Sequence, residues 1–326
     1  MSNLVTIFGG SGFVGRYIAR RMAKEGWRVR VAVRNVNKAM FVRTYGVVGQ
    51  VEPVFCNIRD DASVAAVTKG ADAVVNCVGV LDEVGKNTFA AVQAEGAGRI
   101  ARIAAELGVP RMIHVSAIGA DAASKSLYAR TKAEGEAAVL AHMPAAVILR
   151  PSIVFGAEDQ FFNRFAGMSR LGPVLPVVGA ETRFQPVFVD DVAAVGARAV
   201  LGQVPAGVYE LGGPDVHTFR ELMQEMLGVI RRRRLVMNIP FWAAHVMAAG
   251  FAALRFVTFG LVSPPITKDQ IRNLAVDNVV SSDAKGFGDL GMTATAMEAV
   301  LPDYLWRFRP SGQYDAIKES ARNLRT

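Results

Sequence analysis

The chain has 326 residues, of which 51% are hydrophobic and 20% charged, and it contains 31 glycines and two cysteines. This composition excludes a disordered tail protein, and the length with so few cysteines excludes a small disulfide-stapled scaffold. The length suffices for one large domain or two unequal ones. Cys56 and Cys77 lie in apolar runs, which favours buried thiols in a reducing compartment over a disulfide or a metal pair.

The formal net charge is +8, and it is unevenly distributed. Residues 1–150 carry 19 Lys and Arg against 12 Asp and Glu, whereas residues 151–326 carry 18 against 17. A basic excess indicates phosphate, nucleic acid or an anionic surface as a partner, or only a solubilising surface. Four cations share one predicted helix and are expected to face solvent or an acidic partner: Arg16, Arg20, Arg21 and Lys24.

No targeting segment is expected, because the first predicted strand already begins at Leu4. The most apolar stretch, Phe241–Val262, contains His245 and Arg255. An arginine that deep in lipid costs about 2.5–3.5 kcal/mol on insertion scales, so this stretch is not predicted to span a membrane.

Short apolar strands alternate with helices in the first half of the chain. Strands are predicted at Leu4–Phe8, Arg28–Val33, Val51–Phe55, Ala73–Val78, Met112–Val115 and Val147–Leu149. The clearest helices are predicted at Phe13–Glu25, Phe89–Leu107 and Tyr128–His142. This alternation predicts an α/β fold, a Rossmann-type doubly wound parallel sheet covered by helices on both faces.

The regular alternation of strands and helices ends after Pro151, where glycine and proline become frequent. The further elements predicted are a strand Pro186–Val189, a helix Asp190–Leu201, a strand Val208–Leu211, a helix Phe219–Ile230, a strand Leu235–Ile239 and an apolar helix after Pro240. We expect a nucleotide-binding domain of residues 1–155 that residues 186–212 rejoin. Residues 156–185 and 213–326 would form a smaller C-terminal lobe over the carboxyl ends of the strands.

A glycine-rich turn directly follows the first strand and reads Gly9-Gly10-Ser11-Gly12-Phe13-Val14-Gly15. Gly9 can form the tight turn, Gly12 lets backbone amides approach a pyrophosphate, and Gly15 lets the helix pack closely on the strand. The helix amino end adds unpaired N–H groups and the positive end of a dipole. A strand–turn–helix context of this kind indicates a dinucleotide site rather than a turn without a ligand.

The end of the second strand bears on which dinucleotide binds. An acidic residue there would accept hydrogen bonds from the ribose 2′-hydroxyl of NAD. The strand ends instead in Val33-Arg34-Asn35, and no Asp or Glu occurs between Arg28 and Glu52. A guanidinium suits a 2′-phosphate, so Arg34 favours NADP(H), although a surface arginine would look the same in the sequence.

Tyr128 and Lys132 lie four residues apart, on one face of a predicted helix. A nearby ammonium lowers the pKa of a phenol, so the tyrosine could exchange a proton with a carbonyl or hydroxyl, while the lysine could hold the nicotinamide ribose. The pair alone is a weak signal. It becomes specific after a glycine-rich turn and a dozen residues beyond a strand that ends in His114-Val115-Ser116.

The chain resembles the extended short-chain dehydrogenase/reductase superfamily at its glycine-rich turn, at Asn57–Asp60, at Asn76–Gly79, at Tyr128 and Lys132, and at Arg150–Gly156. The resemblance implies that Asn57 and Ile58 border the adenine. It further implies that Cys77, Val78 and Gly79 line the cofactor and that Pro151, Ser152 and Ile153 meet its nicotinamide end.

Within that superfamily the chain is most similar to the NADPH-binding accessory subunits of respiratory complex I (NADH:ubiquinone oxidoreductase) and their bacterial relatives. The closer match lies in Arg150–Phe161, Phe165–Met168 with Gly172-Pro173, Gln185–Val192 and Ile266–Ile271. This resemblance implies a tightly bound, structural NADPH, complex I subunits as partners, and peripheral contact with a membrane surface.

One departure from the family pattern bears on catalysis. Active extended members carry Ser or Thr at the end of the fifth strand, and the corresponding residue here is Ala117. Ser116 is adjacent, but neighbouring residues at a strand end point to opposite faces. Ser116, Tyr128 and Lys132 therefore remain the catalytic candidates, while the alternative is that Tyr128 and Lys132 only hold the ribose.

Three functions follow as hypotheses. The first is a structural NADPH-binding protein that belongs to complex I or helps assemble it. The second is an active NADP-dependent oxidoreductase or epimerase acting on a small carbonyl, quinone or sugar-like substrate. The third is a redox-sensing regulator that reports the NADPH/NADP ratio. No metal ion is expected, and the location is expected to be cytoplasmic, peripherally on the cytoplasmic face of the inner membrane.

Two features of the second half leave alternatives open. The run Arg231–Arg234 could bind an anionic lipid or an acidic partner, or its first residues could cap the preceding helix and face water. It has no interleaved aromatic residues, which argues against nucleic acid. The apolar helix Phe241–Phe259 could belong to the core of the lobe or lie on a membrane or a membrane-embedded partner.

Overall fold

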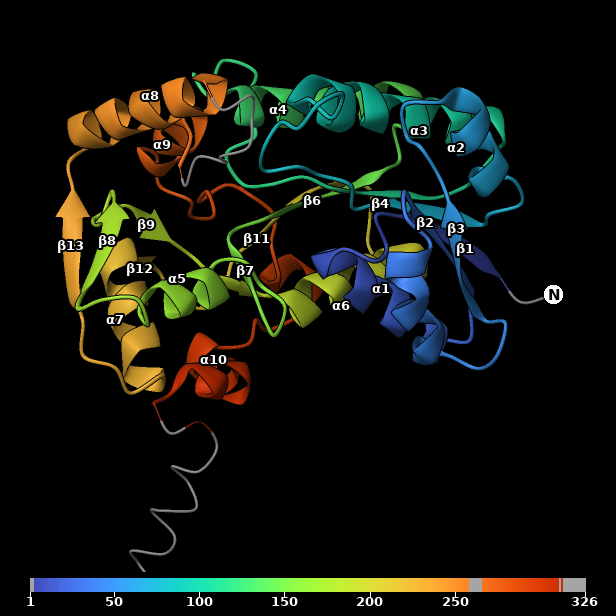
Figure 1. The fold of residues 1–326 in the computed structure, drawn as a ribbon. Coiled ribbons are helices and arrows are strands. Elements are labelled where there is room, and N and C mark those ends of the chain that lie inside the picture. The colour runs from blue at the N-terminus through green and yellow to red at the C-terminus, as the bar shows by residue number, and fades with distance from the viewer. Residues whose placement is uncertain (1–2, 258–265, 311, 313–326) are drawn as a thin grey trace, which may run out of the picture. The chain divides into compact units, whose positions relative to one another are not determined.

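The computed structural model describes residues 3–257, 266–310 and 312, with the backbone alone for 252–257 (Figure 1). These residues belong to two compact units. Unit 1 comprises Met1–Ser152, Val189–Gly212 and Val280–Ala294, and unit 2 comprises Ile153–Phe188, Gly213–Val279 and Thr295–Thr326.

Unit 1 is built on one sheet of seven parallel strands in the order β11-β6-β5-β4-β1-β2-β3. The strands are β1 (Leu4–Phe8), β2 (Arg28–Val33), β3 (Val51–Phe55), β4 (Ala73–Asn76), β5 (Met112–Val115), β6 (Val147–Pro151) and β11 (Gly207–Leu211). The order reverses between β1 and β4, which is the switch point where such sheets open a crevice for a ligand. The predicted doubly wound Rossmann-type sheet is confirmed.

Helices cover both faces of this sheet (Figure 1). One face carries α1 (Phe13–Lys24), α6 (Val189–Val200) and the short helix η1 (Asn37–Tyr45). The other carries α2 (Asp61–Thr68), α3 (Glu95–Glu106) and α4 (Leu127–His142). In α1 the buried side chains include Ile18, Ala19 and Met22, whose spacing of three and four residues forms one apolar stripe.

Most strand bounds in unit 1 agree with the sequence, because each strand is a short apolar run closed by glycine or polar residues. The fourth strand is shorter than predicted and ends at Asn76. The Asn76 side chain explains this, since its Oδ1 accepts a hydrogen bond from the Val78 N–H at 3.0 Å and turns the chain. The helix predicted at Phe89–Leu107 begins with one π-helical turn, η2 (Ala90–Ala94), before α3.

Among its described residues, unit 2 contains three two-stranded sheets. They pair β10 (Val187–Phe188) with β7 (Val154–Phe155), β12 (His217–Thr218) with β9 (Arg183–Phe184), and β13 (Leu235–Ile239) with β8 (Val174–Val178). Its helices are α5 (Phe162–Met168), α7 (Phe219–Val229), α8 (Phe241–Val257), α9 (Lys268–Leu274) and α10 (Met297–Leu305). A hydrophobic core that includes Phe155, Phe162 and Phe219 is shared by β7, β8, β9, β13, α5, α7 and α10, whereas α8 contributes to a separate small core.

Two segments lie differently from the expected division of the chain. The strand expected at Pro186–Val189 is the two-residue β10, which pairs with β7 rather than with the main sheet. Residues 280–294, expected in the C-terminal lobe, belong to unit 1. The Ser281 N–H donates to a Glu210 carboxylate oxygen at 2.9 Å, and the Arg198 side chain donates to the Leu290 carbonyl at 3.0 Å.

The basic run after α7 is largely bonded to main-chain carbonyls of unit 2. Arg231 has a φ of 53° at the end of the helix, and its N–H donates to the Gly228 carbonyl. The Arg232 Nε donates to the Phe308 carbonyl at 2.9 Å, and the Arg234 Nε donates to the Ser169 carbonyl at 2.7 Å. Arg232 and Arg234 therefore link the segment after α7 to two other segments of unit 2.

In the part of α8 whose side chains are described, two alanines are buried and several large apolar side chains are exposed. Ala244 and Ala248 lie in a small core with Ile271, whereas Trp242, Val246 and Met247 are exposed. Residues 258–262 of the predicted apolar stretch lie outside the described residues. Within the part of the chain that the structure describes, no helix has the length and apolar character needed to cross a membrane.

Candidate functional site

The glycine-rich turn leaves no room for side chains. Gly9 has a φ of 73°, and a Cβ on it would lie 3.2 Å from the Cys77 carbonyl group and 3.3 Å from the Val78 side chain. A Cβ on Gly15 would lie 2.4 Å from the Gly9 carbonyl oxygen. Helix α1 therefore packs directly on the turn, and the turn packs on the chain after β4.

The amino end of α1 is open to an anion. Its N-cap, Gly12, offers no side chain to the first-turn N–H groups, and the first turn carries no acidic residue. These amides, with the positive end of the helix dipole, can bind a pyrophosphate. The turn thus offers the hydrogen-bond donors that the pyrophosphate of a dinucleotide needs.

The sequence did not predict that the Arg16 side chain contacts the glycine-rich turn. Its guanidinium donates to the Ser11 carbonyl at 3.0 Å and to the Gly12 carbonyl at 3.2 Å, and it lies 4.9 Å from the centre of the Phe41 ring. The expectation that Arg16 faces only solvent or a partner is therefore wrong. Its spacing of four residues from Gly12 on a helix is the sequence signal that could have found it.

Arg34 directly follows β2, the strand beside β1, and is exposed. No ion pair of Arg34 occurs among the described residues. Its neighbour Asn35 is engaged locally, because the Asn35 Oδ1 accepts a hydrogen bond from the Lys38 N–H at 3.2 Å. Arg34 can therefore meet an anion at the carboxyl end of β2 without first breaking a salt bridge.

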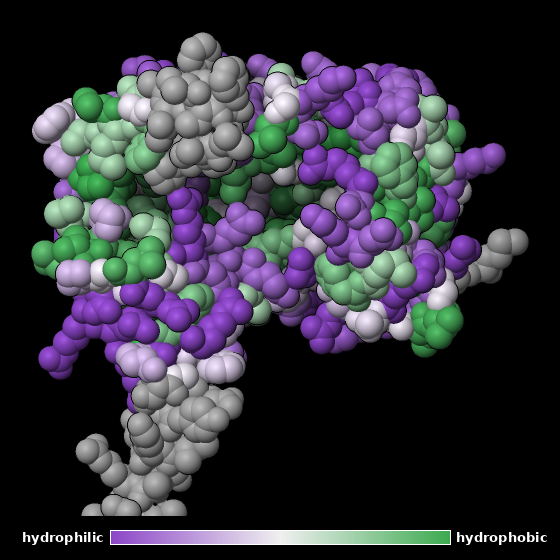
Figure 2. Space-filling view, in the orientation of Figure 1, coloured by the Kyte–Doolittle hydropathy of each residue, from purple (hydrophilic) through white to green (hydrophobic). Residues whose placement is uncertain are grey.

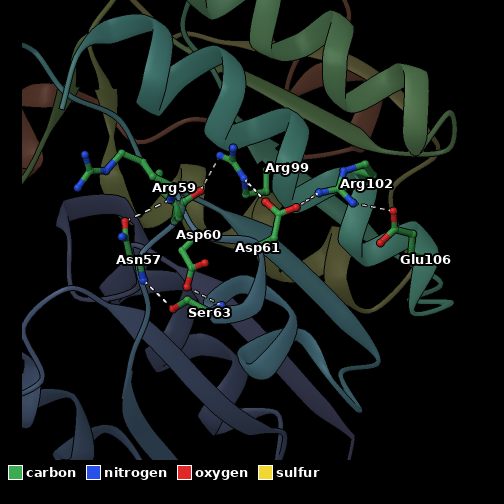
Figure 3. Close-up of polar contacts among 9 residues, drawn as sticks. Asn57, Arg59, Asp60, Asp61, Ser63, Arg99, Arg102 and Glu106 are labelled. Atoms are coloured by element: carbon green, nitrogen blue, oxygen red, sulfur yellow. Dashed lines mark hydrogen bonds and ion pairs between the residues drawn. The ribbon is translucent and has the colours of Figure 1, made fainter. Parts of the chain in front are cut away.

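The chain after β3 is held by a polar network, drawn in Figure 3. The Asn57 N–H donates to Ser63 Oγ at 2.9 Å, and the Asn57 Oδ1 accepts from the Arg59 N–H at 3.2 Å. From α3, the Arg99 side chain donates to the Ile58 carbonyl at 3.1 Å. Asn57 and Ile58 are thereby fixed at the carboxyl end of β3.

The Arg99 side chain is held in turn by an ion pair (Figure 3). Asp61, in the first turn of α2, accepts from Arg99 and from Arg102, at 2.5 Å each. The two arginines hold the pKa of the Asp61 carboxyl below its ordinary value. Exposed pairs of this kind contribute little stability, so their effect here is to fix the orientation of Arg99.

The end of β4 is positioned by a buried pair. Asn76 Nδ2 donates to His114 Nδ1 at 3.1 Å, since the Asn76 Oδ1 already accepts from Val78. Burial lowers the pKa of His114 to about 3, so the imidazole is neutral and carries its proton on Nε2. Both cysteines are free thiols, and burial raises the pKa of Cys77 to about 12, which keeps it a thiol at this site.

Tyr128 and Lys132 lie in the first turns of α4, which Ser126 caps. The Lys132 Nζ donates to the Val115 carbonyl at 3.2 Å, and a Cβ on Gly79 would lie 3.5 Å from that nitrogen. The Tyr128 ring meets Phe89 edge-on, with ring centres 5.9 Å apart. The Lys132 side chain therefore lies between the end of β5 and the chain that follows β4.

The electrostatics of this pair differ from expectation. Burial raises the pKa of Tyr128 to about 12, so the expected lowering by a nearby ammonium is wrong for the protein alone. Burial also lowers the pKa of Lys132 to about 8, against the opposing effect of Glu136. Desolvation disfavours the charged form of each group and is the main cause of both shifts.

Ser116 is buried, and its Oγ has no hydrogen-bond partner among the described residues. It follows β5 with its N–H bonded to the Leu149 carbonyl at 2.7 Å. Further along the sheet edge, the Pro151 carbonyl accepts from the Ile118 N–H at 3.0 Å, and Ser152 is buried. Ile153 belongs to unit 2, where its carbonyl accepts from Val187.

Comparison with known proteins identifies the family. Residues 5–212 match the NAD dependent epimerase/dehydratase family. The mitochondrial NADH dehydrogenase (ubiquinone) 1 alpha subcomplex subunit 9 of Arabidopsis thaliana is 36% identical, covering 95% of this chain and 79% of that protein. The NADH-ubiquinone oxidoreductase 40 kDa subunit of Neurospora crassa is 30% identical, covering 95% and 80%.

An enzyme and a solved structure are also similar. The ceramide reductase of Caulobacter vibrioides is 31% identical, covering 73% of this chain and 74% of that protein. The fold is shared with the dTDP-glucose 4,6-dehydratase DesIV of Streptomyces venezuelae, with a TM-score of 0.70 and 20% identity over 95% of this chain and 98% of that one. With a family match over more than half of its length, and relatives of at least 30% identity along nearly all of it, this chain belongs to the NAD dependent epimerase/dehydratase family.

Proposed function

We propose that this chain binds NADPH as a non-catalytic subunit or assembly factor of respiratory complex I. The observation that carries the proposal is the contrast within unit 1. The Gly9–Gly15 turn and Lys132 beside Gly79 have the features expected of a nucleotide site, whereas the position of the catalytic hydroxyl holds the methyl group of Ala117. The complex I subunits among the relatives support the choice of partner.

The proposed cofactor site follows the carboxyl ends of the strands of unit 1. The pyrophosphate meets the amides of the Gly9–Gly15 turn, and the adenine lies beside Asn57 and Ile58. Cys77, Val78 and Gly79 line the middle of the nucleotide, while Tyr128 and Lys132 hold the nicotinamide ribose. Pro151 and Ser152 complete the nicotinamide end within unit 1.

Arg34 supports the choice of NADPH over NADH. It stands where an NAD-binding protein would carry an acid for the ribose 2′-hydroxyl, and it is exposed at the end of β2. A guanidinium there can form paired, charge-assisted hydrogen bonds with a 2′-phosphate. Arg16 adds positive charge at the neighbouring turn.

The chemistry of the site supports a bound but inert nucleotide. A nicotinamide supplies or accepts a hydride only if a neighbouring group moves the matching proton. Tyr128 would have to ionise from a pKa of about 12, and Ser116 forms no hydrogen bond with Tyr128 or Lys132 among the described contacts. Proton transfer is therefore unfavourable here.

A second candidate function is an NADPH-dependent reductase. The pKa of Lys132, lowered to about 8, makes its ammonium group a better proton donor than an ordinary lysine, and hydride reduction of a carbonyl needs such a donor. The similarity to a ceramide reductase favours this alternative too. Its substrate would be a small carbonyl, a quinone or a keto-lipid.

Turnover separates the two functions. The purified protein is loaded with NADPH, and the nucleotide absorbance is followed with and without added quinones and ketones. The structural function predicts no oxidation and slow exchange, with Tyr128→Phe unchanged. Oxidation that Tyr128→Phe abolishes, and that Tyr209→Phe on β11 leaves intact, would establish the reductase instead.

The exposed apolar face of α8 and β13 is the proposed contact with complex I at the cytoplasmic face of the inner membrane. Its exposed side chains are Trp242, Val246 and Met247 with Leu235 and Met237. Figure 2 shows apolar surface gathered over this part of unit 2. Exposed apolar patches of this kind mark interaction sites.

The partner is tested by gentle lysis and fractionation. We expect the chain to co-purify with complex I, and a Trp242→Lys, Val246→Lys double variant to be released into the soluble fraction. Val48→Lys, at a fully exposed residue of unit 1, is the matched control and should stay bound. A wild-type chain found free of complex I would refute the proposed partner while leaving NADPH binding untouched.

A further inference from the structure

One arginine links the glycine-rich turn to η1, a segment to which the proposed nucleotide site assigns no role. The Arg16 guanidinium donates to the carbonyls of Ser11 and Gly12, at 3.0 Å and 3.2 Å. It also lies over the ring of Phe41 in η1, 4.9 Å from the ring centre. Because a guanidinium is planar, it can donate hydrogen bonds at its edge while its face meets an aromatic ring.

The hydrogen bonds from Arg16 fix the orientation of the first peptide groups of α1. A trans peptide directs its carbonyl and the following N–H to opposite sides, and no cis peptide occurs among the described residues. Because the Gly12 carbonyl is bonded to Arg16, the Phe13 N–H points the other way, to the amino end of α1. That end is where the pyrophosphate is proposed to bind.

The turn needs support of this kind because of its composition. Three of its first four residues are glycines, whose backbone has the widest conformational freedom. Within the turn, the Gly12 N–H donates to the Gly9 carbonyl at 2.8 Å. A turn that is already fixed when the ligand arrives binds it with a smaller loss of entropy. The bonds from Arg16 therefore prepare the amide donors for an anion.

The helix η1 presents Phe41 from a fixed backbone. Ala39 and Val42 are buried, and the Thr44 hydroxyl donates to the Phe41 carbonyl at 2.8 Å. The Tyr45 ring meets the Phe41 ring edge-on, with ring centres 6.1 Å apart. The Phe41 side chain remains 38% exposed, so burial is not the main contribution of its ring. The ring is instead placed to hold the Arg16 guanidinium.

Two other arginines of α1 take no part in this contact. Arg21 donates two hydrogen bonds to the Asp190 carboxylate, at 2.8 Å each. Arg20 is exposed and forms no ion pair within the described part of the chain. Since Arg20 lies one helical turn beyond Arg16, a substitution there changes the same chemical group without touching the glycine-rich turn. Arg20 is therefore the matched control.

We propose that Arg16 is a positioning residue for the dinucleotide and that Phe41 holds it, so that the Arg16–Phe41 pair keeps the glycine-rich turn in the conformation that binds a pyrophosphate. The inference rests on the proposed NADPH site. The pyrophosphate is common to NADPH and NADH, whereas the 2′-phosphate proposed to meet Arg34 belongs to NADPH alone. The pair therefore determines the affinity for both nucleotides and not the preference between them.

The test is calorimetric titration of the full chain with NADPH and with NADH. Arg16→Lys keeps the charge but lacks the planar fork, so it should weaken the binding of both nucleotides by about tenfold or more. Phe41→Leu keeps an apolar side chain without the ring and should weaken both by about two- to fivefold. Phe41→Trp should bind both at least as tightly as the wild type, because tryptophan attracts cations most strongly and the exposed site has room. Arg20→Lys should change neither affinity.

The outcomes distinguish this inference from the proposed function. A wild type that binds neither nucleotide refutes the NADPH site and the inference with it. If the wild type binds NADPH and Arg16→Lys binds it within twofold of the wild type, only the positioning role is overturned. A loss in Arg16→Lys that is confined to NADPH also overturns it, because Arg16 would then contact the 2′-phosphate. Equal affinities of Phe41→Leu and Phe41→Trp would overturn the pair, and if Phe41→Leu does not fold, Arg16→Lys still decides.

Discussion

The contact between Gly15 and the turn before it makes Gly15→Ala a sharp test of the nucleotide cradle. The added Cβ would lie 2.4 Å from the Gly9 carbonyl oxygen and 2.8 Å from the Gly10 Cα. Both neighbours are backbone atoms, so no side chain can move aside. Relief to an ordinary contact of about 3.4 Å requires that α1 and the turn separate by about 1 Å.

A separation of that size predicts a large loss of affinity and a small loss of stability. Overpacking costs about 1–3 kcal/mol, offset by about 1 kcal/mol from the better helix propensity of alanine. A shift of about 1 Å breaks hydrogen bonds between the turn amides and a pyrophosphate. Each charge-assisted bond contributes about 1.5–3 kcal/mol, so two lost bonds weaken NADPH binding by roughly two to four orders of magnitude.

The assay is NADPH titration by calorimetry, with chemical denaturation of the nucleotide-free protein beside it. The control is Gly228→Ala in α7, where a Cβ would meet nothing within 4 Å. That variant should bind NADPH normally and be more stable by about 0.5–1 kcal/mol. A Gly15→Ala protein that binds NADPH within threefold of the wild type would refute the cradle at this turn.

Three further predictions concern charge and burial. Arg34→Ala should weaken the binding of NADPH at least tenfold and leave the affinity for NADH unchanged. The control Arg28→Ala, at the exposed start of β2, should change neither affinity. Equal affinity of the wild type for the two nucleotides would contradict this prediction. Because Lys132 titrates at about 8 when folded and at 10.5 when unfolded, the free energy of unfolding of the nucleotide-free protein should rise between these pH values by up to roughly 3 kcal/mol. Lys132→Met should flatten that rise in denaturation curves, and an unaltered rise would assign it to other groups. Tyr304→Phe removes the 2.5 Å hydrogen bond to the buried Asp159, and it should cost about 1–3 kcal/mol by urea denaturation; a cost below about 0.5 kcal/mol would show that the carboxyl finds another donor.

The sheet of unit 1 could be predicted because its signals are local. A buried parallel strand is a continuous apolar run, and the glycine-rich turn marks where the first one ends. The one overshoot, past Asn76, arose because Cys77 and Val78 are also apolar, while the turn is made by the Asn76 side chain. In unit 2, strands such as β9 and β12 have two residues each and carry no periodicity to detect.

The candidate site was only partly predictable, because only some of its features depend on local sequence. The Gly9–Gly15 turn and Arg34 follow from spacing and chemistry within one strand–turn–helix unit. The pKa of Tyr128 depends on how deeply the folded chain buries it, which no spacing reveals.

The interleaving of the two units has a consequence for how the protein is made. The last strand of the main sheet, β11, leaves the ribosome after the segment 153–188 of unit 2, and residues 280–294 follow later still. Until then the Glu210 carboxylate lacks the Ser281 N–H that it binds in the finished protein. No single cut in the chain therefore yields a complete nucleotide-binding fragment, and a nascent chain must keep its sheet edge open while most of unit 2 is synthesised.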